Sequence, residues 1–224
     1  MNPGFYALVG PNAAGKTHYL HTLMGPNAAF VPAGPDAKFA GATVTDHIRA
    51  ARASRPLDPI EFPDARIDEL SVGERRLLTL EVALAANKPL LLLDEPFDGI
   101  DTATRKRVRE RLIDHISEDP QLTIVMSSHR SEDFRGLANH VIQVFDKSVS
   151  EPMLIDDLRR SFPTITGPAD VIAELASQHR TIETSSLGPV AKAVFSEPVD
   201  THLNCTYPDD AELIDLLATE RIAR

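Results

Sequence analysis

The sequence predicts an α/β fold in which helices flank a mostly parallel sheet and a small α+β appendage follows. Short apolar runs alternate with helical periodicity through the first two thirds of the chain, a pattern typical of parallel sheets covered by helices. The four leucines at 90–93 form a continuous apolar run, as expected of a strand buried on both faces. The pattern loosens near residue 148, so we expect a main domain at 1–148 and a small C-terminal accessory region at 149–224.

The first half of the main domain predicts two strands and two helices. Apolar residues 5–9 predict a strand that stops at a glycine-rich turn, and residues 16–24 are compatible with a helix. The remaining segments are a strand at 29–31, a Pro- and Gly-rich loop at 32–41, a helix at 43–53 and a Pro-containing loop at 54–66.

The second half of the main domain begins with a helix at Ser71. Ser71 and Glu74 have the spacing of a capping box, which predicts a helix that runs to about residue 86. Val108, Leu112 and Ile116 keep helical spacing in a later helix. The strands are expected at 90–93, 122–126 and 141–145.

The sequence of the accessory region predicts shorter strands and helices. We expect strands near 164–166, 181–183 and 193–195, and helices near 169–178 and 209–220. The sequence attaches no function to them.

Composition excludes several classes of protein. The chain is 42% hydrophobic, enough for a substantial core, and its net charge of -10 opposes sequence-independent binding to nucleic acid. Cys205 is the single cysteine, so no internal disulfide is expected. The chain has neither an apolar stretch long enough to span a membrane nor a secretory signal, so we expect it inside the cell.

A phosphate-binding loop is predicted between the first strand and the first helix. In such a loop the backbone amides and the N-terminus of the helix face the phosphates, the lysine neutralises the β- and γ-phosphates and the hydroxyl binds Mg²⁺. The alternative is a glycine-containing turn that matches the pattern by chance. The motif consists of Gly10, Pro11, Asn12, Ala13, Ala14, Gly15, Lys16 and Thr17, and we expect His18 to lie at the same nucleotide site.

Two acidic residues end the leucine-rich strand. A buried strand holds its terminal carboxylates rigidly at the sheet edge where ligands bind. Asp94 is therefore expected to hold Mg²⁺ through water, and Glu95 to act as general base toward the attacking water. Alone, the pair could be an ordinary strand end before a turn, but the P-loop favours the nucleotide site.

Three further motifs give the chain its resemblance to a family. Residues 70–74, Leu-Ser-Val-Gly-Glu, resemble the signature motif of ATP-binding-cassette (ABC) ATPases. Residues 98–101 resemble the family's D-loop, and residues 127–129, which end in His129, its switch-histidine loop. The five motifs occur in the family's order over residues 4 to about 147.

The resemblance implies an ATPase subunit of an ABC transporter that uses ATP and Mg²⁺ beneath a separate membrane permease. Ser71 and Gly73 of one subunit would contact the γ-phosphate held by the other subunit, with Glu74 at the same nucleotide site, so a head-to-tail homodimer, or a dimer with a related ATPase subunit, is implied. His129 would contact the γ-phosphate and Asp101 would couple the two sites. The subunit is expected in the cytoplasm, peripheral at the inner face of the membrane, without nucleic acid. For Ser71, an ordinary capping box is the alternative.

The sequence departs from the family at several positions. The family commonly has Gly at the positions of Ala13 and Val72 and Gln at Glu74, and Ala33 stands where a Mg²⁺-contacting glutamine is usual. The stacking aromatic for adenine is missing, and few residues separate Thr17 from Ser71, so a reduced helical subdomain is expected.

These departures keep two other functions open. A soluble ABC-type ATPase of DNA repair or translation is one, because such proteins often carry Glu at the position of Glu74. A nucleotide-binding regulator with little turnover is the other, because of Ala33 and the missing aromatic.

Overall fold

The main sheet contains seven strands among the described residues. The computed structural model describes residues 1–34, 37–51 and 65–219. The strand order is β2-β3-β4-β1-β5-β6, and β7 also pairs with β5. The strands are β1 (Gly4–Val9), β2 (Ala28–Val31), β3 (Leu90–Asp94), β4 (Thr123–Ser127), β5 (His140–Phe145), β6 (Ser148–Val149) and β7 (Met153–Leu154).

The strands β1 to β5 run parallel, which confirms the predicted fold class. In the register of this sheet, Ser127 lies opposite both Leu8 of β1 and Asp94 of β3. The carboxyl ends of the three central strands therefore reach the same edge, where open α/β sheets bind ligands. The short strands β6 and β7 pair antiparallel to β5.

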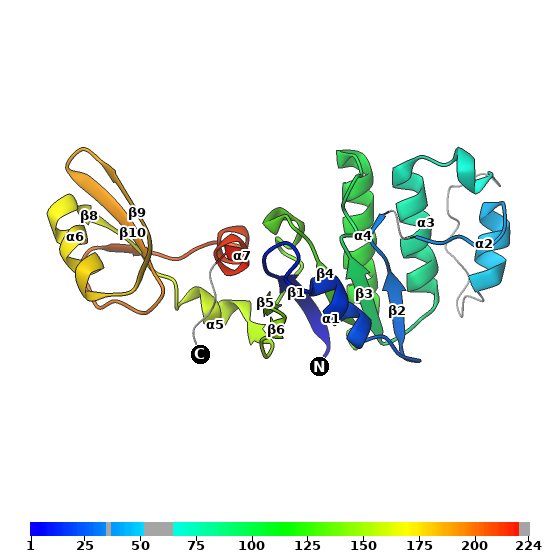
Figure 1. Cartoon of the computed structure of the whole chain (residues 1–224), viewed down its shortest axis with the longest axis horizontal. Coiled ribbons are helices and arrows are strands. Elements are labelled where there is room, and N and C mark those ends of the chain that lie inside the picture. Colours follow the sequence, from blue (N-terminus) through cyan, green and yellow to red (C-terminus); the bar gives the residue numbers. More distant parts are fainter. Residues whose placement is uncertain (35–36, 52–64, 220–224) are drawn as a thin grey trace.

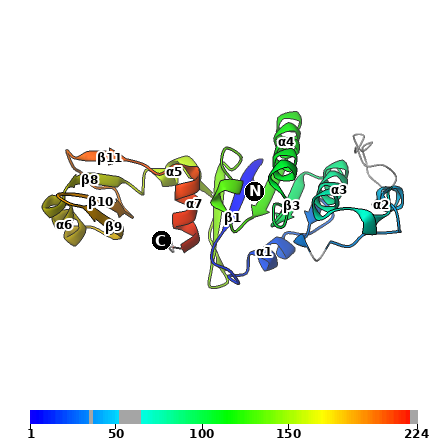
Figure 2. The same ribbon diagram turned by 90° about the horizontal axis from the view of Figure 1, so that it is seen from above.

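Helices cover both faces of this sheet (Figures 1 and 2). The view from above in Figure 2 shows α3 and α4 on one face and α1 on the other. The helical elements are α1 (Lys16–Thr22), α2 (Val44–Ala51), α3 (Val72–Ala85), α4 (Thr102–Glu118) and the 3-10 turns η2 (Ile67–Glu69) and η3 (Ser131–Asp133).

The leucine-rich strand β3 is buried on both faces, as its sequence predicts. Leu91 and Leu93 belong to the core beneath α3 and α4. Leu92 belongs to the second core, together with Leu20 of α1. Since a fully buried leucine contributes about 1.5–3 kcal/mol through the hydrophobic effect, these residues anchor the acidic end of the strand firmly.

A second sheet forms most of the C-terminal region, at one end of the molecule (Figure 1). Its strands pair antiparallel in the order β11-β8-β10-β9, and α6 packs against it through Ile172. The elements are α5 (Ile155–Arg159), β8 (Thr164–Pro168), α6 (Ala169–Gln178), β9 (Thr181–Leu187), β10 (Val190–Phe195), β11 (Asn204–Thr206) and α7 (Asp210–Thr219).

Two helices of the C-terminal region pack on the main core. Leu158 of α5 and Leu213 and Leu217 of α7 are buried in the same cluster as the central strands. Gln143 of β5 donates a hydrogen bond from Nε2 to the Leu217 carbonyl at 2.7 Å. Helix α7, the last described helix, thus packs back against the core of the main sheet. The division of the chain at residue 148 remains a prediction.

The differences from the expected elements concern short segments. The strands β6, β7 and β11 and helix α5 were not predicted, since two to five residues carry too little periodicity. The expected helix at 43–53 and loop at 54–66 lie partly outside the described residues, as does the end of the helix at 209–220.

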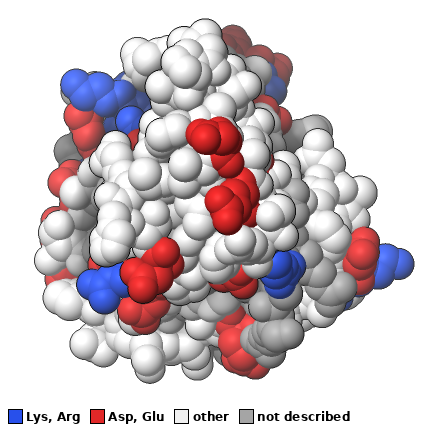
Figure 3. Space-filling model, turned by 90° about the vertical axis from the view of Figure 1, so that its left-hand side faces the viewer, with Lys and Arg blue, Asp and Glu red and all other residues white. Residues whose placement is uncertain are grey.

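On the face formed by the C-terminal region, the distribution of charged side chains does not indicate a charged partner. Figure 3 views the molecule from this side: uncharged side chains cover most of the face, and acidic side chains are interspersed among them.

Within the described ranges, none of the helices has the length and apolar character needed to cross a bilayer.

Candidate functional site

The loop between β1 and α1 has a backbone that suits glycine at its two ends. Gly10 has φ +144°, and a Cβ there would lie 2.0 Å from the Val144 carbonyl oxygen, so no larger residue fits. Gly15 has φ +111°. Ala13 adopts φ +62°, a left-handed conformation that is uncommon for a residue with a side chain. The loop therefore forms despite alanine at this position.

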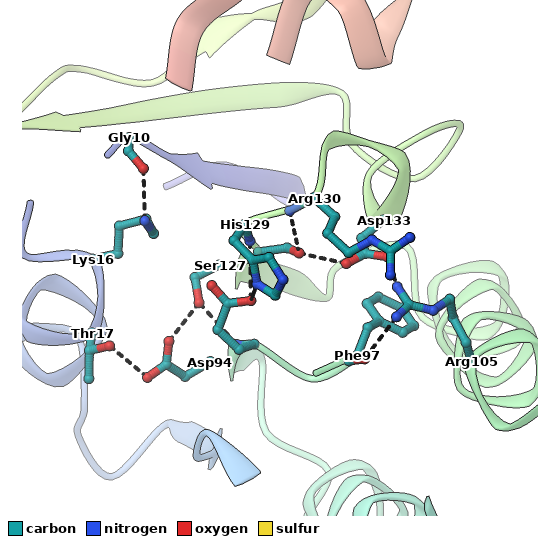
Figure 4. Close-up of polar contacts among 12 residues, drawn as sticks. Gly10, Lys16, Thr17, Asp94, Phe97, Arg105, Ser127, His129, Arg130 and Asp133 are labelled. Carbon is teal, nitrogen blue, oxygen red and sulfur yellow. Dashed lines mark hydrogen bonds and ion pairs between the residues drawn. The ribbon is translucent and has the colours of Figure 1, made fainter. Parts of the chain in front are cut away.

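Lys16 is a buried cation at the start of α1. Its side chain donates from Nζ to the carbonyls of Gly10, at 2.8 Å, and Pro11, at 3.1 Å (Figure 4). Burial lowers the pKa of Lys16, and the nearby carboxylates of Glu95 and Asp94 oppose that shift. Lys16 thus places its ammonium inside the loop, close to two acidic residues.

Asp94 joins the loop to the neighbouring strand. Its carboxylate accepts hydrogen bonds from the Thr17 hydroxyl at 2.8 Å and from the Ser127 hydroxyl at 2.6 Å. Asp94 is only 3% exposed, and a buried carboxylate requires such partners. Three elements, α1, β3 and β4, therefore meet at this carboxylate (Figure 4).

Glu95 contacts the predicted switch histidine. One carboxylate oxygen of Glu95 lies 2.8 Å from Nδ1 of His129 and accepts the backbone N–H of His129 at 3.2 Å. The Glu95 N–H donates to the Ser127 hydroxyl at 3.0 Å, and Glu95 has φ +46°. The carboxylate is thus held at the strand ends beside Asp94.

The signature segment caps its own helix. Ser71 is the N-cap of α3: its hydroxyl accepts the N–H of Glu74 at 3.2 Å, and the Glu74 carboxylate accepts the N–H of Ser71 at 2.7 Å. The predicted capping box is therefore present. Gly73 is required by packing, because a Cβ there would lie 2.9 Å from the Thr104 hydroxyl oxygen of α4.

Asp101 is the N-cap of α4. Its carboxylate accepts hydrogen bonds from the N–H groups of Ala103 and Thr104 and from the Thr104 hydroxyl. These bonds lower the pKa of Asp101. Within this single chain, Asp101 has a local capping role.

The structure brings together one subset of the predicted residues. Lys16, Thr17, Asp94, Glu95 and His129 meet at the carboxyl edge of the sheet. The polar groups of Ser71, Glu74 and Asp101 instead form caps at the starts of α3 and α4. Asn12 and His18 are exposed.

Sequence reasoning missed two structural links at the site. The first link is Asp133 of η3, which is buried and accepts a hydrogen bond from the Ser128 hydroxyl at 2.5 Å. Asp133 also forms an ion pair with Arg105 of α4. Nη2 of Arg105 in turn donates to the Phe97 carbonyl at 3.0 Å. This pair joins the segment after His129 to α4 (Figure 4).

Arg76 is the second missed link. It is 4% exposed and donates to the carbonyl of Glu95 at 3.2 Å. A signal was present in the sequence, since Arg76 shares helical spacing with the buried residues Leu80 and Ala83. A charged residue on an apolar helix face requires a buried partner.

The chain is similar to ATP-binding proteins of known families. A family model described as "AAA domain, putative AbiEii toxin, Type IV TA system" matches residues 53–132. The ABC transporter ATP-binding protein YtrB of Bacillus subtilis is 33% identical over 131 residues, 58% of this chain and 44% of YtrB. The choline transport ATP-binding protein OpuBA of Bacillus subtilis is 28% identical over 165 residues, 72% of this chain and 41% of OpuBA.

Solved structures share the fold. The ATP-binding subunit of an ABC transporter matches with a TM-score of 0.62 at 20% identity, over 71% of this chain and 82% of that chain. A metal-chelate type ABC transporter in an inward-facing conformation matches with a TM-score of 0.57 at 19% identity, over 86% of each chain. The present chain spans less than half the length of the curated relatives YtrB and OpuBA.

Proposed function

Because this chain is a relative of the ATP-binding proteins of ABC transporters, we propose that it binds and hydrolyses ATP and powers a separate membrane permease through ATP-driven dimer closure. One observation supports this most. Lys16, Thr17, Asp94, Glu95 and His129 converge at one edge of the parallel sheet, with a cation beside the loop and two acidic residues at the strand end.

The first part of the proposal concerns phosphate binding. The amides of the loop and the N-terminus of α1 face the triphosphate, and Lys16 exchanges its bonds with the Gly10 and Pro11 carbonyls for bonds with phosphate oxygens. Charge-assisted bonds of this kind contribute about 1.5–3 kcal/mol each. The bound nucleotide is thus held by residues of β1, the loop and α1.

The donor set at Thr17 and Asp94 fits Mg²⁺. A hydroxyl oxygen and a carboxylate oxygen meet there at 2.8 Å, and Mg²⁺ prefers oxygen ligands completed by phosphates and water. Across the described ranges no group of three or more His, Cys, Asp or Glu could hold a metal ion, so the remaining ligands come from the nucleotide and solvent. When bound, Mg²⁺ neutralises charge on the β- and γ-phosphates.

Hydrolysis uses Glu95 as the general base. A water oxygen forms a bond to the γ-phosphorus, the bond from that phosphorus to the β,γ-bridging oxygen breaks, and the Glu95 carboxylate accepts the proton of the water. ADP and phosphate leave. His129, which touches the same carboxylate at 2.8 Å, orients it and reaches the γ-phosphate.

The second half of the site comes from another subunit. Ser71 and Gly73 at the start of α3 offer helix N-terminal amides and the positive end of the helix dipole to the γ-phosphate held by the partner. A head-to-tail homodimer therefore encloses two nucleotides. Outside the nucleotide site, a permease couples to this closure and holds the subunit at the inner face of the membrane.

The substitution Glu95→Gln tests the assignment of the base. The amide keeps the shape of the side chain but cannot accept the proton, so we expect turnover to fall about 100- to 1,000-fold, within the range known for general bases. ATP binding is retained, and the variant accumulates as an ATP-loaded dimer. Steady-state phosphate release and light scattering with ATP measure the two effects.

The matched control is Glu110→Gln, an exposed glutamate on α4. It should hydrolyse ATP as the unchanged protein does and form no trapped dimer. If Glu95→Gln hydrolyses ATP at the normal rate, Glu95 is not the base. If the unchanged protein binds ATP with turnover at background, the chain is a nucleotide-binding regulator instead.

The permease is tested separately. A permease without its own ATP-binding domain, encoded beside this chain, is expected to co-purify with it in detergent. Recovery of the chain with bound nucleic acid, and without a multi-span protein, would favour the soluble DNA-repair or translation ATPase.

A further inference from the structure

Arg76 is a buried arginine that links three parts of the candidate site. It lies in α3 and is 4% exposed. Its Nη1 donates to the Pro32 carbonyl, after β2, at 2.6 Å, and its Nη2 donates to the Glu95 carbonyl, after β3, at 3.2 Å. A Cβ on Gly34 would lie 3.0 Å from Nη2, so the guanidinium fits closely against the segment after β2.

The Arg76 guanidinium is buried close to acidic side chains. Its Nε is buried and has no hydrogen-bond partner in the part of the chain that the structure describes. Burial lowers the pKa of Arg76, while Asp98, Asp94 and Glu95 oppose that shift. A guanidinium stays protonated in such a site, so a positive charge lies beneath the acidic strand end.

The backbone that Arg76 holds is strained. Glu95 adopts φ +46°, a left-handed conformation that residues with a side chain adopt only when their surroundings enforce it. Its N–H is fixed by Ser127, and its carbonyl accepts both Arg76 and the N–H of Asp98, the latter at 3.1 Å. Because the backbone direction determines where the side chain points, these bonds also direct the carboxylate toward His129.

We infer that Arg76 is a positioning residue that holds the turn at Glu95 and transmits movements of α3 to the Glu95 carboxylate. This inference rests on the proposed function, in which Glu95 is the base and the start of α3 meets the partner's nucleotide. Ser71 is the N-cap of the same helix, so a partner contact that shifts the start of α3 would also shift the guanidinium that holds Glu95. Dimer closure would in this way set the catalytic carboxylate of the same subunit.

Arg111→Met is the matched control for loss of a guanidinium bound near α3. Arg111 of α4 forms an ion pair with Glu81 of α3, with Nη2 donating to Oε2 at 2.9 Å. Removing it leaves Glu81, only 7% exposed, without that ion pair, so this variant also loses stability. It leaves the bond between Arg76 and Glu95 in place.

Amide hydrogen exchange tests the inference without activity. In Arg76→Met, the Asp98 amide, which donates to the Glu95 carbonyl, should exchange at least tenfold faster relative to the amides of β5. In Arg111→Met, the exchange rate of the Asp98 amide relative to the β5 amides should stay within twofold of its value in the unchanged protein. Arg76→Lys should restore part of the protection of the Asp98 amide that Arg76→Met loses. Equal ratios in the two methionine variants would overturn the positioning role.

Kinetics give the second readout. Arg76→Met should lower kcat at least tenfold and change the KM for ATP less than threefold. In single-turnover experiments, the variant that carries both Arg76→Met and Glu95→Gln should be no slower than Glu95→Gln alone. Additive losses, or a kcat within twofold of the unchanged protein, would refute the inference. If the unchanged protein itself shows no turnover, the proposed function fails, and the exchange ratio alone decides the role of Arg76.

Discussion

The P-loop end and the signature end of the candidate site are built in opposite ways. At the P-loop end, formed by residues 10–17 with Asp94 and Glu95, Lys16 is 9% exposed and Asp94 is 3% exposed. At the signature end, residues 71–74, Val72 is 57% exposed, and Ser71 and Glu74 are exposed as well. The charged groups of Lys16 and Asp94 are thus buried at the P-loop end, whereas the polar side chains of the signature end are exposed.

This difference agrees with the proposed division of the site between two subunits. Buried polar groups need partners inside the protein, and Asp94 finds them in Thr17 and Ser127. At the signature end, the N–H groups of Val72 and Gly73 occupy the first helical positions and have no partner within the helix. Under the proposed function, the first half is preorganised for phosphate, and the second half retains donors for a group that a partner would bring.

The largest effect is expected at the P-loop end, from Lys16→Met. The substitution keeps the apolar stem but removes the ammonium, so ATP affinity should fall by at least about a hundredfold, as the loss of two charge-assisted bonds predicts. Calorimetric titration of the nucleotide measures this. Lys88→Met, at an exposed lysine, is the control and should bind ATP normally. An affinity of Lys16→Met within threefold of the unchanged protein would remove Lys16 from the nucleotide site.

At the signature end, Ser71→Asp separates capping from catalysis. Aspartate is as good an N-cap as serine, so the unfolding free energy should change little, whereas Ser71→Ala should lose about 1 kcal/mol. The new carboxylate would face the partner's γ-phosphate, and turnover should fall at least tenfold while ATP affinity at low protein concentration is kept. Denaturant unfolding and phosphate release measure both quantities. Normal turnover in Ser71→Asp would show that the signature end acts only as a cap.

The smallest effect concerns the pH dependence of the same cap. The bonds from the Ser71 hydroxyl and N–H lower the pKa of Glu74 in the folded chain. A carboxyl group with a depressed folded-state pKa stabilises the protein above its unfolded pKa, which is about 4.3, and loses that contribution as the pH falls through the lower folded value. The difference in Tm between the unchanged protein and Glu74→Ala should therefore shrink when the pH is lowered from 7 toward 3. A difference that stays constant would show that the carboxylate does not stabilise the helix start.

Local signals in the sequence predicted the main elements and the position of the P-loop. The leucine run gave β3, and the spacing of Ser71 and Glu74 gave the start of α3, because both patterns act over a few neighbouring residues. The P-loop pattern predicted a turn after β1 that leads into a helix beginning at Lys16, and the structure shows both. The assigned roles of these residues, and of Glu95 and His129, remain predictions.

Contacts between distant segments could not be read from the sequence. Arg105 and Asp133 lie in different elements, and only the packing of α4 against η3 brings their charges together. The return of α7 to the main core likewise depends on Leu213 and Leu217 meeting strands far earlier in the chain. No local periodicity encodes such partners.

The sequence by itself determined the class of fold, the order of its main strands and helices and the place of the P-loop motif between a strand and a helix, because hydrophobic periodicity and short motifs act locally. Only the tertiary structure decided that Glu95 adopts a left-handed turn, that His129 contacts its carboxylate and that the buried Arg76 of α3 donates to its carbonyl. Those features require the register of parallel strands and the packing of α3 against them, and both form only when the whole core closes.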